Sequence, residues 1–199
     1  TLTLTGTNTF TGFTVVNGGI LSINQDRALG AVPGSTDADN IILNASTLKT
    51  TASFTINTKR GIELRANSFI NVDSSTTLTY AGIIKRQNSE NNGYTKSGTG
   101  TLALSGDSTY TGTTIISAGV ITIAHAGSLG STSGATSITS GAALSISGGI
   151  TVAEPITVNG TGVSSGGAIV FTGGNNTYSG AITVGSSSTI VSSSGAQTI

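Results

Sequence analysis

Two stretches of this sequence, 100 residues apart, are nearly the same. Residues 1–23 read TLTLTGTNTFTGFTVVNGGILSI, residues 101–123 read TLALSGDSTYTGTTIISAGVITI, and the two align without a gap. A looser third copy, IVFTGGNNTYSGAITV, covers residues 169–184 with one extra glycine. The shared core is Gly-x-x-Thr-(Phe/Tyr)-(Thr/Ser)-Gly, flanked on both sides by alternating apolar residues. Because internal repeats are the signature of solenoid architectures, they limit the possible folds more than any other feature of the chain.

Each copy predicts short strands separated by tight turns. Strict alternation over residues 1–5 sends both leucines to one face of a strand, and Asn17-Gly18-Gly19 is a strong turn signal. In the first copy the expected inward positions are Leu2, Leu4, Val16, Leu21 and Ile23. We expect three strands to make one coil of roughly 20–25 residues. Since a single coil cannot bury its apolar face, the coils must stack, and a right-handed parallel β-helix is the simplest arrangement.

The remaining sequence continues this pattern and predicts one all-β stack over residues 1–199. Further strands are expected at 41–43, 54–56, 62–64, 69–72, 77–80, 143–146, 150–152 and 156–158. Roughly eight coils about 4.8 Å apart would form a rod segment about 40 Å long. Methionine is absent and the chain starts within a strand, so we interpret it as a fragment of a longer solenoid.

The composition excludes several classes of protein. Charged residues make up 8% of the chain and the formal net charge is zero, which excludes a basic surface for nucleic acid or anionic membranes. The absence of cysteine excludes disulfides and thiolate sites. We find no transmembrane run and expect none in this chain.

Two segments depart from the strand pattern. Ala28-Leu29-Gly30 and Ser128-Leu129-Gly130 follow the first and second copies at matching places, and we expect each to be a short helical excursion out of the stack. Residues 85–93 are polar and charged without apolar periodicity, which predicts a projecting loop. We expect that a partner, if there is one, binds this loop. The candidate binding residues are Lys85, Arg86, Gln87, Asn88, Glu90, Asn91 and Asn92.

The second copy, extended to residues 96–123, resembles the autotransporter-associated β-strand repeat. The resemblance rests on KSGTGTLALSG at residues 96–106, followed by TYTG at 109–112, and the first copy shows the same pattern. This resemblance implies a right-handed parallel β-helix in the exported passenger domain of a bacterial surface protein. It carries over no catalytic residue, because the repeat is a scaffold motif.

Candidate catalytic and metal-binding residues are few. His125 is the only histidine, and a lone loop histidine is more often solvated than catalytic. Asp37 and Asp39 could place two carboxylates together, but calcium requires several oxygen ligands, and turn carboxylates are the plainer interpretation. We therefore predict no enzyme activity, no metal and no cofactor.

The sequence predicts a structural stalk segment of a secreted or surface-attached bacterial adhesin, located outside the cell. Expected partners are a host or matrix glycan or protein, or another copy of the chain. A polysaccharide-active β-helix enzyme is one alternative, and an acidic cluster with a basic residue would distinguish it. An ice-binding solenoid is another, but its flat face would require threonines stacked coil upon coil, and the Thr-x-Thr copies lie far apart in the chain.

Overall fold

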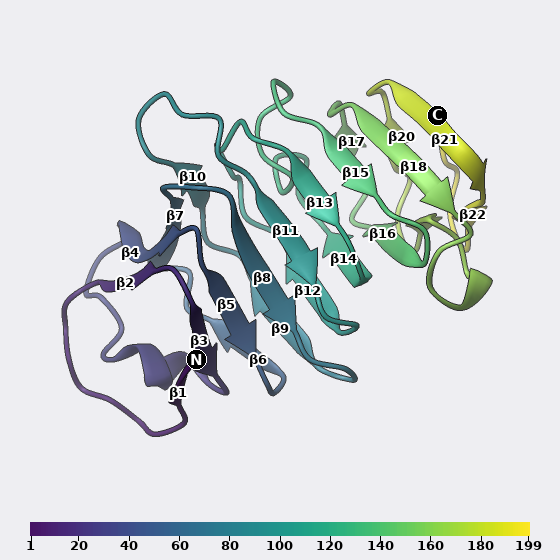
Figure 1. The fold of residues 1–199 in the computed structure, drawn as a ribbon. Coiled ribbons are helices and arrows are strands. Elements are labelled where there is room, and N and C mark those ends of the chain that lie inside the picture. Colours follow the sequence, from purple (N-terminus) through teal and green to yellow (C-terminus); the bar gives the residue numbers. More distant parts are fainter.

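The computed structural model describes all 199 residues as a parallel β-solenoid (Figure 1). It contains 22 strands and two short 3₁₀ turns, η1 (Asp26–Leu29) and η2 (Val163–Ser165). Every strand pairing is parallel. The predicted all-β parallel β-helix in a continuous stack is confirmed. The structure contains no helix with the length and hydrophobicity needed to cross a lipid bilayer.

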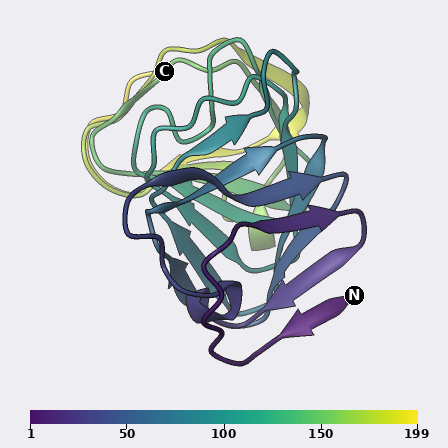
Figure 2. The same ribbon diagram turned by 90° about the vertical axis from the view of Figure 1, so that its left-hand side faces the viewer.

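The strands form four sheets around one core, and Figure 2 views the stack from its N-terminal side. Sheet A has nine strands: β1 (Leu2–Leu4), β3 (Ile20–Ile23), β5 (Thr47–Thr50), β8 (Ser68–Val72), β11 (Tyr94–Ser97), β13 (Thr114–Ile116), β15 (Thr136–Ile138), β18 (Ile156–Gly160) and β21 (Ile182–Ser188). Sheet C has seven: β6 (Phe54–Ile56), β9 (Thr77–Tyr80), β12 (Thr101–Leu104), β14 (Gly119–Ile123), β16 (Ala142–Ile146), β19 (Ile169–Phe171) and β22 (Ile190–Ser192). The third side of the stack is closed by sheet B, with β2 (Thr14–Asn17), β4 (Asp37–Asn44), β7 (Arg60–Leu64) and β10 (Ile84–Arg86), and by sheet D, with β17 (Thr151–Val152) and β20 (Thr177–Tyr178).

Inward-facing side chains form ladders along the stack. In sheet A one ladder runs through the register-paired residues Leu2, Leu21, Leu48, Ile70, Lys96, Ile116, Ile138, Val158 and Val184. A single cluster of 35 buried residues, mostly apolar, extends from Val16 to Tyr178. Burying an aliphatic side chain contributes about 1.5–3 kcal/mol, so this cluster is the main source of stability.

The predicted inward positions of the first copy are confirmed in register but not all in burial. Leu2 pairs with Leu21 and Leu4 pairs with Ile23, as the alternation requires. Leu21 and Ile23 are buried and Val16 is 9% exposed, whereas Leu2 is 61% exposed. Leu2 lies on the first strand of sheet A, which has a neighbouring strand on one side only, so its inward face is left uncovered.

Coils of three strands are present in the middle of the stack, such as β5, β6 and β7, but the prediction that the three strands of one repeat copy form one coil is wrong. In the first copy β3 lies directly beside β1, with Leu2 opposite Leu21, and in the second copy β14 lies beside β12, with Leu102 opposite Ile121. The third strand of each copy therefore begins the next coil.

The similar copies also occupy different sides of the solenoid. The first strand of the first copy, β1, belongs to sheet A, whereas the matching strand of the second copy, β12, belongs to sheet C. Several three-strand coils lie between them, so each copy specifies a local strand–turn–strand unit but not its position around the axis.

The prediction that the Ala-Leu-Gly and Ser-Leu-Gly segments leave the stack is wrong. The first segment does form a helical turn, η1, but Leu29 and Leu129 are each 1% exposed and belong to the core cluster. Both segments lie against the aromatic residue of the preceding repeat, since Ala31 N–H donates to the Phe10 carbonyl and Ser131 N–H donates to the Tyr110 carbonyl. The apolar side chains of these segments are part of the core, and the chain does not leave the stack.

The glycine that ends each segment is required by this packing. Gly30 and Gly130 have positive φ angles of 84° and 93°. A side chain at either position would overlap the ring and the carbonyl oxygen of Phe10 or Tyr110, respectively. Only glycine combines this backbone conformation with such close contact.

Candidate functional site

The segment predicted as a partner-binding loop divides into a strand and a loop. Lys85 and Arg86 lie on β10, which pairs with β7, so they belong to the wall of the stack. Residues 87–93 form the connection to β11 and project beyond the stack in Figure 1. Asn88, Glu90 and Asn91 in this connection are exposed. Regular strand pairing resumes at Tyr94.

Lys85 forms part of a charged cluster on the outer surface of sheet B. Its Nζ lies 2.7 Å from Glu63 Oε2, and Arg65 Nε donates to Glu63 Oε1 at 2.7 Å. Burial raises the pKa of the Glu63 carboxyl, but hydrogen bonds from Lys85 and Arg65 outweigh this and hold the pKa below its usual value. Sequence reasoning missed Glu63 and Arg65 because the Lys85–Glu63 ion pair, which brings the three side chains together, joins two coils. A single paired carboxylate does not provide the acid–base pair of a glycosidase.

Arg86 and Asn91 are connected through the next coil. Arg86 Nη1 donates to Thr111 Oγ1 at 3.1 Å, and Thr111 Oγ1 donates to Asn91 Oδ1 at 2.9 Å. Asn92 Nδ2 donates to Glu90 Oε2 at 2.8 Å within the loop. The end of the loop is therefore held against the second repeat copy, while Gln87 and Asn88 make no side-chain hydrogen bond.

The other sequence candidates lie apart from the loop. His125 is half-exposed, accepts a hydrogen bond from Gly127 N–H, and lies 3.8 Å from Asp107 Oδ1. Asp37 Oδ2 accepts from Asn40 Nδ2 at 3.1 Å. No group of three or more His, Cys, Asp or Glu side chains is arranged to hold a metal ion.

The outward face of sheet A does not form a plane of threonines. Its central row runs Ile20, Thr47, Phe69, Thr95, Ile115, Ser137, Thr157 and Thr183. Phe69 and Ile115 interrupt the hydroxyl groups, and Lys49 projects from the next row. The two Thr-x-Thr copies cannot share a plane, since β1 and β12 lie on different sheets.

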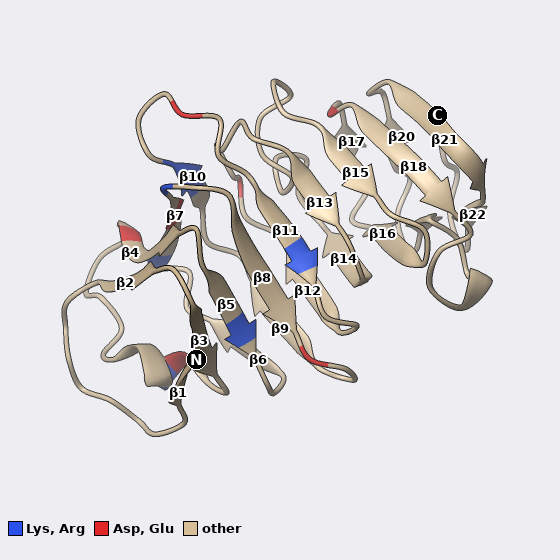
Figure 3. Ribbon diagram, viewed as in Figure 1, with Lys and Arg blue, Asp and Glu red and all other residues tan.

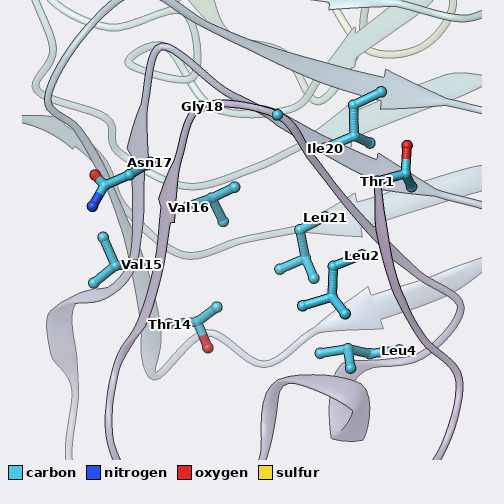
Figure 4. A pocket seen from close by; sticks show the side chains of 11 residues that line it. Thr1, Leu2, Leu4, Thr14, Val15, Val16, Asn17, Gly18, Ile20 and Leu21 are labelled. Carbon is cyan, nitrogen blue, oxygen red and sulfur yellow. The ribbon is translucent and has the colours of Figure 1, made fainter.

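An apolar hollow of about 320 Å³ opens at the N-terminal end of the stack (Figure 4). Leu2, Leu4, Val16 and Leu21 point into it from β1, β2 and β3. These are inward core positions left without a covering coil, so the hollow has the character of an interface rather than of a polar active site.

Besides Glu63, three charged side chains are buried in the solenoid, and sequence reasoning identified none of them as buried. Arg60, 0% exposed, donates to Asp26 and Asn40 side chains and to two backbone carbonyls. Lys96 Nζ donates to three backbone carbonyls, and burial lowers its pKa to about 8. Glu154 is 3% exposed, and burial raises its pKa to about 8. Of these three residues, only the burial of Lys96 has a signal in the sequence, because Lys96 occupies an inward position of the strand alternation. In the structure it lies in register between Ile70 and Ile116.

Comparison with known proteins gives two matches. The family described as Passenger-associated-transport-repeat matches residues 1–23, 95–123 and 164–186, which overlap the three repeat copies. Over 133 residues the chain is 38% identical to the protein named Adhesin BmaC autotransporter from Brucella suis biovar 1 (strain 1330). This match covers 66% of the chain and 4% of that relative. No solved structure matches the chain.

Proposed function

We propose that this chain, which carries the passenger repeat of autotransporters, is a rod-like spacer segment of a bacterial adhesin at the cell surface. The matched repeats and the adhesin relative bear out the resemblance found in the sequence. They also support a location outside the cell and a non-enzymatic role. The chain spans a small part of the relative's length, so the activity and partners of the whole protein are part of this proposal.

The single observation that carries the spacer role is the continuity of the stack. One core cluster and a nine-stranded parallel sheet run through the chain without a domain boundary. Nine strands about 4.8 Å apart span about 38 Å. Such a rod holds whatever lies at its ends at a fixed separation.

Deletion of a whole coil tests the spacer role. Gly119 pairs with Ala142, so removal of residues 119–141 takes out β14 and β15 and lets β12 face β16 and β13 face β18. In the full-length protein displayed on cells, we expect this deletion to preserve surface display and adhesion. A matched deletion of residues 119–130 breaks the register and should abolish display. If the protein without this coil is displayed normally but adhesion is lost, the removed coil carries a specific contact and is not a spacer.

A second candidate role is partner contact through residues 87–93. The favouring observation is the exposure of Asn88, Glu90 and Asn91 on a loop held by Thr111. Replacement of residues 87–92 by a short Gly-Ser turn should leave the thermal transition within a few degrees and reduce adhesion. The same replacement at the exposed turn of residues 131–133 is the control. Unchanged adhesion in the first variant would show that the loop is only an insertion.

A further inference from the structure

A small polar hollow lies where the projecting loop meets sheet A. Its volume is about 150 Å³, and its walls come from three successive coils: Asn67, then Asn91 and residues 93–95, then Thr113 and Ile115. No charged side chain lines it. Typical sites for drug-sized ligands measure about 300–1,000 Å³, so this hollow suits a single small ring.

The polar groups of the hollow are oriented by the protein and still have free donors. Asn67 Oδ1 accepts from Gly93 N–H at 2.9 Å, and Asn91 Oδ1 accepts from Thr111 Oγ1 at 2.9 Å. These bonds fix both side-chain amides with their Nδ2 groups uncommitted, because neither nitrogen has an acceptor within the protein. Thr113, also exposed, uses its hydroxyl in no protein hydrogen bond. The side chains that carry these three free donors all line the hollow.

Glycines keep the backbone around the hollow closely packed. A side chain at Gly93 would overlap the Thr113 carbonyl, and one at Gly112 would overlap the backbone at Asn92. Gly112 is the last residue of the shared repeat core, so the repeat itself brings the loop against Thr113. This close packing makes the site preformed rather than dependent on loop closure.

An exposed apolar surface lies beside the hollow. Thr95, one of the lining residues, pairs with Phe69 on one side and with Ile115 on the other. Phe69 is 46% exposed and Ile115 is 36% exposed. Asn67 and Phe69 precede and follow the buried Ser68, so both side chains point outward on the same face of sheet A. An aromatic face next to amide and hydroxyl donors is complementary to a sugar ring, which has apolar C–H faces and a rim of oxygen atoms.

We propose that this hollow is a binding subsite for a neutral saccharide. One sugar ring packs on Phe69 and Ile115, and its oxygens accept hydrogen bonds from Asn67 Nδ2, Asn91 Nδ2 and Thr113 Oγ1. The inference rests on the proposal that this face of the segment contacts a partner, and it is independent of the spacer role. Neutrality follows from the lack of any cationic side chain in the lining, since Lys85 is already paired with Glu63.

The test is NMR titration of the isotopically labelled chain with maltotriose, cellotriose and triacetylchitotriose, with sialyllactose as the anionic comparison. We expect at least one neutral trisaccharide to cause saturable shifts confined to residues 67–69, 91–95 and 113–115. Shifts elsewhere, no shifts with any neutral probe, or equal binding of sialyllactose would overturn the proposal.

Two substitutions remove single donors while preserving the structure. Asn67→Asp and Asn91→Asp retain the Oδ1 acceptors of Gly93 and Thr111 but lose the free amide nitrogens. Each should weaken saccharide binding about fivefold, the effect of one lost hydrogen bond, and Phe69→Ala should weaken it by at least as much. Asn175→Asp is the matched control, because Asn175 Oδ1 accepts from Ala196 N–H far from the hollow. If Asn175→Asp weakens binding as much, the site assignment is wrong.

The experiments distinguish failure of the saccharide subsite from failure of the proposed role of residues 87–93 in adhesion. Saccharide binding by the purified chain, with no effect of the loop replacement on cell adhesion, would uphold the subsite and contradict the loop's role in adhesion. Loss of adhesion on loop replacement, without saccharide binding, would overturn the subsite and favour a different partner.

Discussion

At the residue scale, charged side chains are buried in the solenoid where backbone carbonyls or opposite charges bind them. Arg60 has a partner on each of its three guanidinium nitrogens, and these bonds hold η1 against the next coil. Lys96 has three carbonyl acceptors, Ser97 and Gly98 where β11 leads to β12 and Ala118 between β13 and β14. Burial of a charge without such partners would cost far more than these contacts return.

Glu154 is the exception among the buried charged residues. Thr136 Oγ1 donates to its Oε1 at 3.0 Å, but its Oε2 has no partner and is inaccessible to solvent. It is also the only Asp, Glu, Lys or Arg residue after Asp107 in the sequence, so the second half of the chain has no lysine or arginine to pair with it (Figure 3). Burial accordingly favours the protonated carboxyl.

Protonation of Glu154 predicts a pH-dependent stability. Its pKa rises from 4.5 to about 8 on folding, so between these values the folded chain binds a proton that the unfolded chain releases. This contribution is complete below about pH 4.5 and is lost as the pH rises through about 8. We expect the melting temperature to fall by several degrees between pH 5 and pH 8.5.

The matched variant for this prediction is Glu154→Gln, which keeps the acceptor for Thr136 and cannot ionise. Its melting temperature should be nearly constant over the same pH range. Thermal unfolding followed by circular dichroism measures both proteins. An equal decline in the variant would assign the pH dependence to another group.

At the element scale, the strand phase decides which substitutions are tolerated. Leu104 on β12 is 4% exposed and pairs with Tyr80 and Ile123, whereas its neighbour Ala103 faces outward between Thr79 and Thr122. Leu104→Ala should lower the free energy of unfolding by about 2–5 kcal/mol. Leu104→Asp should prevent folding, because an unpaired carboxylate would enter the core.

The control for strand phase is Ala103→Ser, which should change the free energy of unfolding by no more than about 0.5 kcal/mol. Urea denaturation monitored by tyrosine fluorescence compares the three variants with the parent chain. A Leu104→Asp protein that unfolds at the parental midpoint would contradict the inward assignment.

Much of the element pattern could be predicted from the sequence because it depends on local rules. Alternation gave the phase of Leu102 and Leu104, and paired glycines gave the turns. The side of the solenoid that each copy occupies depends on the summed length of all intervening coils, which no local pattern encodes. For the same reason, the alignment of Lys85 with Glu63 and the convergence of Asn67, Asn91 and Thr113 could not be predicted from single segments.

The two segments that contain Leu29 and Leu129 show a different limit of sequence reasoning. Ala28-Leu29-Gly30 departs from the period of a strand, and this departure by itself predicts a segment outside the stack. The side chain of Leu29 nevertheless enters the core, because a 3₁₀ turn can direct one apolar residue inward as well as a strand does. Loss of strand periodicity therefore indicates a change of local geometry and not exposure.

At the scale of the whole molecule, the two ends of the stack differ from its middle. The N-terminal end exposes the edges of β1 and β2 together with the apolar hollow, and Leu2 and Val15 there are 61% and 39% exposed. Unpaired strand edges beside apolar side chains favour pairing with another chain. We expect the isolated chain to associate end to end with rising concentration.

Charged substitutions at this end should suppress the association. Leu2→Lys combined with Val15→Lys places positive charge on both exposed edges, and Ser137→Lys in the middle of sheet A is the control. Analytical ultracentrifugation over a concentration series should show self-association for the parent and the control but not for the double variant. A parent chain that stays monomeric throughout would contradict the prediction.

The central claim, a continuous rod of stacked coils, is tested most directly by distances between spin labels along sheet A. The chain has no cysteine, so pairs of labels can be introduced at Thr47 with Thr157 and at Thr47 with Thr183, three positions in one outward row. Pulsed electron paramagnetic resonance should give backbone separations of about 24 Å for the 47–157 pair, five strand spacings, and about 29 Å for the 47–183 pair, six spacings. Narrow distributions that lengthen by one spacing between the pairs are the predicted result. Broad distributions, or a 47–183 distance no longer than the 47–157 distance, would contradict the stack.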